Sequence, residues 1–163
     1  MCSSDLLGVG LHLVDAAGTI VRGLRFDRFA TTVISHGAVI DESGGVRFEQ
    51  DIFTQNASSG LSVVRSAGTT IDHCTFADNG QLGLHAFDAS GLVVRSSRLS
   101  HNNVEQFDPK MEAGGAKFSS VHDVVLDGVM ADTNLGNGIW FDRSEEHTSE
   151  LQSPCNLVCR LLL

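Results

Sequence analysis

Three charged residues and a tryptophan near the end of the repetitive part of the chain have side chains suited to carbohydrate chemistry. Glu112 lies five residues before Lys117, and Trp140 lies two residues before Asp142. A lysine can bind a uronate carboxylate or serve as a general base, and a pair of carboxyl groups can act as acid and base on a glycosidic bond. The flat faces of Trp140 are suited to stacking on sugar rings. We therefore predict Lys117, Asp142 and Glu112 as catalytic residues and Trp140 as a substrate-binding residue.

Three further residues join the predicted substrate-binding set. Phe87 offers a second aromatic face, His85 a ring nitrogen, and Glu105 belongs to an acidic connection, SHNNVEQFDPKMEAG, over residues 100–114. Glu112, Asp142 and Asp41 also offer the carboxylate oxygens that Ca²⁺ prefers, so calcium is kept as a candidate cofactor. No residue set has the spacing of a dedicated metal site, and we name no metal ligands.

An internal repeat has to position these side chains. Glycines open similar phrases along the chain, in the order GLHLV, GAVID, GLSVV, GLHAF, GAKFS and GIWFD, at positions 10, 37, 60, 83, 115 and 138. Within each unit the register is constant, and apolar residues recur 11 and 16 positions after the glycine. Length variation is confined to the segment before the next glycine, as expected of loops between packed elements.

Each unit of about 23 residues contains three short alternating stretches separated by Gly, Ser, Asn or Asp, and no helical periodicity. This pattern predicts an all-β fold, a parallel β-helix of about five and a half coils with three short strands per coil. When each glycine is counted as the first residue of its strand, the second and fourth residues are predicted to point inward. The third residues are then outward and stack in one column: His12, Val39, Ser62, His85, Lys117 and Trp140. The fifth residues form a second outward column: Val14, Asp41, Val64, Phe87, Ser119 and Asp142.

The predicted fold brings the chemical residues to one place. His85, Lys117 and Trp140 fall on successive coils, Asp142 faces the same way, and the 100–114 connection returns directly into Gly115 beside Lys117. We predict a cleft with this sheet as its floor and that connection as its wall. A fourth column, Asn56, Asn79, Asn102 and Asn134, suits a turn in left-handed geometry with amides bonded from coil to coil, and is interpreted as structural.

The two ends of the chain share nothing with the repeat. Back-translation of RSEEHTSELQS at 143–153 gives DNA that resembles a common short-read sequencing adapter, and residues 157–163 continue it. Met1 to Leu6 match the reverse complement of the same adapter. We therefore predict that residues 1–6 and 143–163 are adapter-derived and non-native, and that 7–142 is a β-helix fragment truncated at both ends. Three of the four cysteines lie in these ends, so neither a disulfide nor a zinc site is predicted.

Composition limits the partners. The net charge of −9 without a basic cluster argues against nucleic acid, and no apolar run approaches the length of a membrane span. The oligomeric state and any signal peptide are not predicted.

The units resemble those of right-handed parallel β-helix repeat proteins, the pectin-lyase-like superfamily. The phrase GGAKFSSVHDVVLDGVMADTNLGNGIWFD is similar to bacterial members with a GG-x-K … N-x-G-x-G-[IL]-W-x-D pattern. The resemblance implies a right-handed coil, an extracellular or periplasmic location and a polysaccharide partner. It also implies carbohydrate-active members, and we predict a polysaccharide lyase or epimerase on an acidic glycan. A glycoside hydrolase and a non-catalytic glycan-binding or structural scaffold remain as alternatives, so whether the chain is an enzyme stays open.

Overall fold

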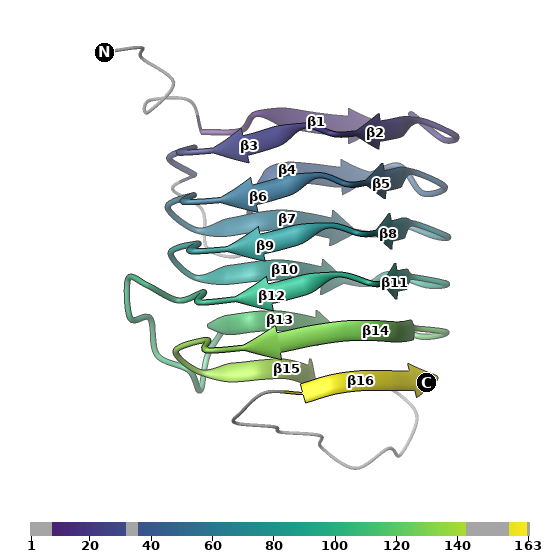
Figure 1. Cartoon of the computed structure of the whole chain (residues 1–163). Helices are drawn as coiled ribbons and strands as arrows, with labels where there is room; N and C mark the ends of the chain where they lie inside the picture. Colours follow the sequence, from purple (N-terminus) through teal and green to yellow (C-terminus); the bar gives the residue numbers. More distant parts are fainter. Residues whose placement is uncertain (1–7, 32–35, 143–156, 163) are drawn as a thin grey trace.

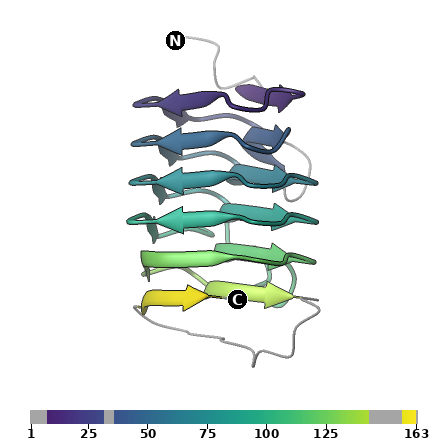
Figure 2. The same cartoon turned by 90° about the vertical axis from the view of Figure 1, so that its right-hand side faces the viewer.

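The chain forms a parallel β-helix in a computed structural model, which describes residues 8–31, 36–142 and, as backbone only, 157–162 (Figure 1). Each coil places one strand in each of three parallel sheets, and successive coils stack along the axis (Figure 2). The first sheet consists of β1 (Leu11–Val14), β4 (Gly37–Glu42), β7 (Ser59–Val64), β10 (Leu82–Phe87), β13 (Gly114–Ser119) and β15 (Asn137–Asp142). The predicted all-β solenoid with three strands per coil is confirmed.

The second and third sheets hold shorter strands and are joined by one long strand. The second sheet contains β2 (Ile20–Arg22), β5 (Arg47–Glu49), β8 (Thr70–Asp72) and β11 (Val93–Arg95). The third contains β3 (Arg25–Asp27), β6 (Ile52–Thr54), β9 (Thr75–Ala77) and β12 (Arg98–Ser100). In the fifth coil, β14 (Val125–Asp132) pairs with β11 through its first half and with β12 through its second. Gly128, with φ of +64°, lies where the strand passes from one sheet to the next.

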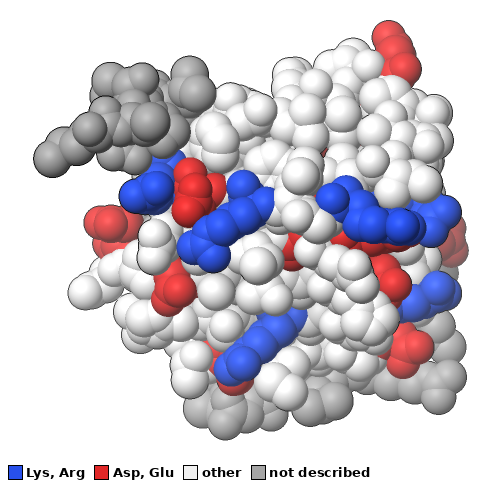
Figure 3. Space-filling view, turned by 45° about the horizontal axis from the view of Figure 1, so that its top comes forward, with Lys and Arg blue, Asp and Glu red and all other residues white. Residues whose placement is uncertain are grey.

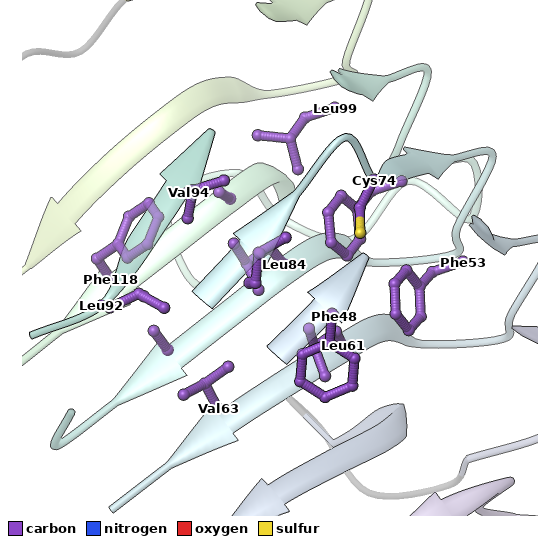
Figure 4. Packing of buried hydrophobic residues seen from close by; sticks show 14 of the residues in the cluster. Phe48, Phe53, Leu61, Val63, Cys74, Leu84, Leu92, Val94, Leu99 and Phe118 are labelled. Atoms are coloured by element: carbon purple, nitrogen blue, oxygen red, sulfur yellow. The ribbon is translucent and has the colours of Figure 1, made fainter. Parts of the chain in front are cut away.

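The core is built from columns of like residues. The predicted rows at 11 and 16 residues after the glycine are correct, because Val21, Phe48, Ile71, Val94 and Leu126 pair in register, as do Phe26, Phe53, Phe76, Leu99 and Ala131. The rings of Phe53 and Phe76 stack with centroids 4.8 Å apart, and Figure 4 shows Phe48, Phe53 and Leu84 in the space between the sheets. Cys74 is buried in the same core.

One predicted register is wrong, in the first strand of the second coil. Val39, not Ala38, pairs with Leu61, so Asp41 lies opposite the buried Val63 and points inward. The outward column therefore contains Ile40 in place of Val39. The following turn is one residue shorter than that of the third coil, since Asp41 pairs with Val63 and Phe48 with Ile71. In this turn Gly44 has a φ of +79°, and a Cβ on it would lie 2.7 Å from the Ala67 carbonyl oxygen.

The asparagine column joins the turns between the third and first sheets. Nδ2 of Asn56 donates to Oδ1 of Asn79 at 2.9 Å, and the same bond repeats from Asn79 to Asn102 and from Asn102 to Asn134. Each amide also donates to a strand carbonyl of an earlier coil. The structural interpretation is confirmed, but the left-handed residue is the one before each asparagine: Gln55, Asp78, His101 and Thr133.

Side chains also form hydrogen bonds between coils at the turn between the second and third sheets. Oδ1 of Asp51 accepts the Leu24 amide at 2.8 Å, and Oγ of Ser97 accepts the Cys74 amide at 3.0 Å. Burial raises the pKa of the Asp51 carboxyl and raises the pKa of the Cys74 thiol to about 12. The Asp51 carboxylate and the Ser97 hydroxyl thus accept hydrogen bonds from backbone amides of the preceding coil.

The outer faces of the second and third sheets are covered by ion pairs. Arg22 and Arg47 both pair with Glu49, and hydrogen bonding from Arg22 lowers the pKa of the Glu49 carboxyl. Arg98 pairs with Asp132 at 2.7 Å. On the face drawn in Figure 3, basic side chains lie beside acidic ones rather than gathering into a basic patch.

A last strand departs from the parallel pattern. The backbone of β16 (Leu157–Leu162) pairs antiparallel with β14. The rest of the two segments predicted to be foreign, 1–6 and 143–163, lies outside the described residues. No helix long and apolar enough to cross a membrane occurs in the described part of the chain.

Candidate functional site

The outer face of the first sheet brings the predicted site residues into neighbouring columns. His85 lies opposite Lys117, and Lys117 lies opposite Trp140, on three successive coils. The adjacent column places Ser119 opposite Asp142. Since both columns are set by strand register alone, the repeat itself positions four of the predicted residues.

Lys117 is the centre of this cluster. Its Nζ donates to the Met111 carbonyl at 2.9 Å and lies 3.4 Å from Oε1 of Glu112 and 3.3 Å from Oδ2 of Asp142. It also lies 4.2 Å from the centroid of the Trp140 ring, within the range of a cation–π contact. The structure thus assembles Lys117, Glu112, Asp142 and Trp140 into one group, which we call the Lys117 cluster.

The connection over 101–113 delivers Glu112 to this cluster because it is held at several points. Oδ1 of Asn103 accepts the Phe107 amide at 2.8 Å, and the Met111 amide donates to the Asp108 carbonyl at 3.0 Å. The loop then re-enters the first sheet through Gly114, at φ of +134°, where a Cβ would lie 2.1 Å from a backbone oxygen of the next coil. Only glycine allows this close approach.

The charges of the cluster are unequally exposed. Lys117 is 5% exposed, whereas the side chains of Glu112 and Asp142 are 30% and 35% exposed. A nearly buried ammonium is stable only with close partners, and the two carboxylates and the Met111 carbonyl supply them. The carboxylates keep solvent-facing oxygens, so this side of the cluster can meet a ligand.

Two predicted substrate-binding residues keep their places on this face. Phe87 is 42% exposed and lies opposite Ser119, one column away from Lys117. His85 is buried rather than an exposed strand residue. His85 is therefore better placed to pack beside Lys117 on the neighbouring strand than to contact a ligand from solvent.

The remaining predicted residue, Glu105, lies elsewhere. It is at the opposite end of the loop from Glu112, with its Cγ 3.1 Å from the position that a Cβ of Gly80 would occupy. There it lines a separate groove together with Arg28 and Asp78. The structure therefore places Glu105 in this separate groove, whereas Glu112 from the same loop contacts Lys117.

Calcium does not fit the carboxylates that the sequence suggested. Asp41 is buried inside the helix, where its Oδ2 accepts the hydroxyls of Ser66 at 3.1 Å and Thr69 at 2.6 Å. Glu112 and Asp142 share the ammonium of Lys117, which takes the place a cation would need between them. No group of three potential metal ligands occurs among the described residues.

One contact of the cluster could not have been found from residue types. The Met111 carbonyl oxygen is nearer to the Lys117 ammonium than either carboxylate is. Every residue has a backbone carbonyl, so residue types could not indicate this contact. Its only trace is the position of Met111 next to Glu112.

Comparison with known proteins agrees with this architecture. Residues 8–153 match the family described as the right-handed β-helix region. The chain belongs to the right-handed β-helix family. The predicted handedness of the coil is thereby confirmed. No curated protein sequence matches the chain.

One solved structure of a β-helix protein is similar in fold. The crystal structure of pectate lyase Pel9A superposes with a TM-score of 0.50 at 16% identity, over 77% of this chain. The chain spans about a third of that structure's length, since 35% of it is covered. At this identity the likeness shows the β-helix fold.

Proposed function

We propose that this β-helix is a carbohydrate-active domain, a polysaccharide lyase or epimerase that acts on an acidic glycan in an extracellular or periplasmic setting. The observation that supports the proposal is the Lys117 cluster, which places one cation, two part-exposed carboxylates and an indole ring at a single point of the first sheet. Similarity to a pectate lyase fold is consistent with a polysaccharide as partner.

In the proposed reaction, a uronate carboxylate displaces Glu112 from the Lys117 ammonium as the loop yields. The paired carboxylate makes the neighbouring C–H bond of the sugar more acidic, and Asp142 takes that proton. In a lyase, the electron pair then forms a C=C bond as the bond to the glycosidic oxygen breaks, and the leaving oxygen takes a proton from a water molecule. In an epimerase, the carbanion is instead reprotonated on its other face. Trp140 and Phe87 would hold the sugar rings.

A lyase assay tests this proposal directly. The purified chain is incubated with polygalacturonate and with alginate, and the unsaturated product is followed by its ultraviolet absorbance. We expect Lys117→Met and Asp142→Asn each to reduce the rate by at least about a hundredfold, the usual contribution of one acid–base group. Lys110→Met, on the same loop but exposed, is the matched control and should keep the rate.

A second candidate is favoured by one specific observation. The Lys117 ammonium already has three partners, with hydrogen bonds to the Met111 carbonyl and Glu112 and an ion pair with Asp142, which is the arrangement of a structural ion pair. In that case the domain is a non-catalytic glycan-binding or structural scaffold. Binding of the acidic glycans by the wild-type chain with neither cleavage nor epimerisation would support the scaffold, and an absence of both binding and turnover would contradict the lyase or epimerase proposal.

A further inference from the structure

The groove that Glu105 lines is separate from the Lys117 cluster and runs along the turns between the third and first sheets. It has a volume of about 620 Å³. Its lining comes from the first four coils: Arg28, Phe29, Ala30, Gln55, Asn56, Ala57, Asp78, Val104 and Glu105. We call it the turn groove.

The turn groove exists because its floor is made of small residues. Ala30 and Ala57 line the groove at equivalent positions of the first two coils. Gly80 occupies the same position in the third coil and admits no side chain, since a Cβ on it would lie 2.1 Å from the Ala57 carbonyl oxygen. In the next coil the chain rises into the 101–113 loop, and Val104 and Glu105 form an end wall. The floor is therefore fixed by backbone packing rather than by mobile side chains.

The side of the groove presents polar side chains at a regular interval. Arg28, Gln55 and Asp78 occupy the same left-handed position on successive coils, with φ between 55° and 59°. Equivalent residues on stacked coils repeat at about 4.8 Å, the spacing of neighbouring strands. That interval is close to the length of one sugar residue in an extended glycan, so consecutive sugars would meet consecutive side chains.

The backbone of the turn groove is already used within the helix. The amide of Ala57 donates to the Phe29 carbonyl at 2.9 Å, that of Gly80 to the Asn56 carbonyl at 2.7 Å, and that of Gln55 to the Ala77 carbonyl at 3.3 Å. A peptide strand is recognised through main-chain hydrogen bonds, which these amides cannot offer. Recognition here has to come from side chains and from the ring of Phe29, which suits a hydroxyl-rich ligand with apolar ring faces.

The charge of the lining separates this groove from the Lys117 cluster. Its ionic groups are Asp78, Glu105 and Arg28, so carboxylates outnumber the guanidinium. His101, on the next coil, is bound to Asp78 at 2.5 Å. An excess of carboxylates disfavours a polyanionic chain, whereas carboxylate, amide and guanidinium groups all bond to neutral sugar hydroxyls.

We propose that the turn groove binds a neutral oligosaccharide with its chain parallel to the helix axis. This site is distinct from the Lys117 cluster and does not depend on the activity proposed there.

The test is calorimetric titration of the full chain with neutral hexasaccharides, cellohexaose and mannohexaose, and with a hexauronate. We expect a neutral hexasaccharide to bind. Ala57→Phe, which fills the exposed floor, should weaken that binding at least about tenfold, the effect of losing about 1.4 kcal/mol. Leu135→Phe, in the same column but outside the groove, should leave it unchanged, and so should Lys117→Met.

A milder pair of variants guards against misfolding of the bulky one. Gln55→Ala removes one amide from the side of the groove, and Thr133→Ala makes an equivalent change at the same left-handed position outside it. Binding weakened by Gln55→Ala alone would support the proposal. It is overturned if neither neutral hexasaccharide binds, if the hexauronate is preferred, or if neutral binding is indifferent to both groove variants.

Discussion

The column of Asn56, Asn79, Asn102 and Asn134, which we call the asparagine ladder, and the Lys117 cluster are both groups of polar side chains that connect successive coils. They are built in opposite ways. In the ladder, the amides of Asn56, Asn79 and Asn102 each make the same two donations, one to the next asparagine and one to a strand carbonyl. Asn79 and Asn102 are fully buried. In the cluster, one lysine binds two different carboxylates and a loop carbonyl that occur once each.

The difference separates polar groups that hold the coil from those that can meet a ligand. Both hydrogens of a ladder amide are donated to the next asparagine and to a strand carbonyl, so none is left for a substrate. Glu112 and Asp142 bind Lys117 on one side and face solvent on the other. Chemistry is therefore expected where the repeat is interrupted.

The largest expected effect comes from breaking the ladder at its centre. Asn79→Ala leaves buried donors and acceptors of both neighbouring coils without partners, and we expect the free energy of unfolding to fall by about 4 kcal/mol. Urea denaturation measures the loss. Asn134→Ala, at the partly buried end of the ladder, is the matched control and should cost about half as much. Equal losses would show that the ladder is not cooperative.

A smaller effect is expected from the buried thiol of the interior. Because folding raises the pKa of Cys74 from 9.0 to about 12, the folded state binds its proton more tightly than the unfolded chain does. The stability that this contributes is fully present below pH 9 and is lost as the pH rises towards about 12. We expect a loss of about 1 kcal/mol for each pH unit in that window.

Cys74→Ser is the control for the alkaline loss, since serine does not titrate there and the next residue in the column is already Ser97. Unfolding by urea at several alkaline pH values should show a flatter profile for the variant. The same steep decline in both proteins would assign it to other groups.

The smallest effect is expected within the Lys117 cluster. A double-mutant cycle of Lys117→Met and Asp142→Asn should give a coupling energy of about 1 kcal/mol, because Asp142 is a third exposed and solvent screens the pair. Added salt should reduce the coupling. The Arg98–Asp132 pair is the comparison, and with Arg98 more than half exposed it should couple more weakly. A coupling of several kcal/mol would show instead that the cluster, like the asparagine ladder, stabilises the fold.

The parts of the fold that recur could be predicted from the sequence. The rows through Phe53 and Val94, the asparagine ladder and the placement of Lys117 opposite Trp140 all follow from strand register, which a repeat displays openly. The approach of Glu112 to Lys117 was predictable for a related reason, since the loop must return to Gly115.

Features that occur once could not be predicted in the same way. Gly37 mimics the repeat glycine, and only the shorter turn at Gly44 shows that the strand is displaced by one residue. Glu105 follows a loop path that no periodicity describes. The burial of His85 depends on packing across coils rather than on its own position in a strand.

The shortened turn at Gly44 has a consequence for how such a chain tolerates change. The corner from Asp41 to Phe48 is one residue shorter than the corner from Val63 to Ile71, yet the strands on both sides of it stay in register with the next coil. The difference in length is confined to this corner and does not alter the pairing of the strands on either side. Turns between sheets can therefore absorb changes in length, and a solenoid of this kind can gain or lose single residues there in evolution without altering the register of its core residues.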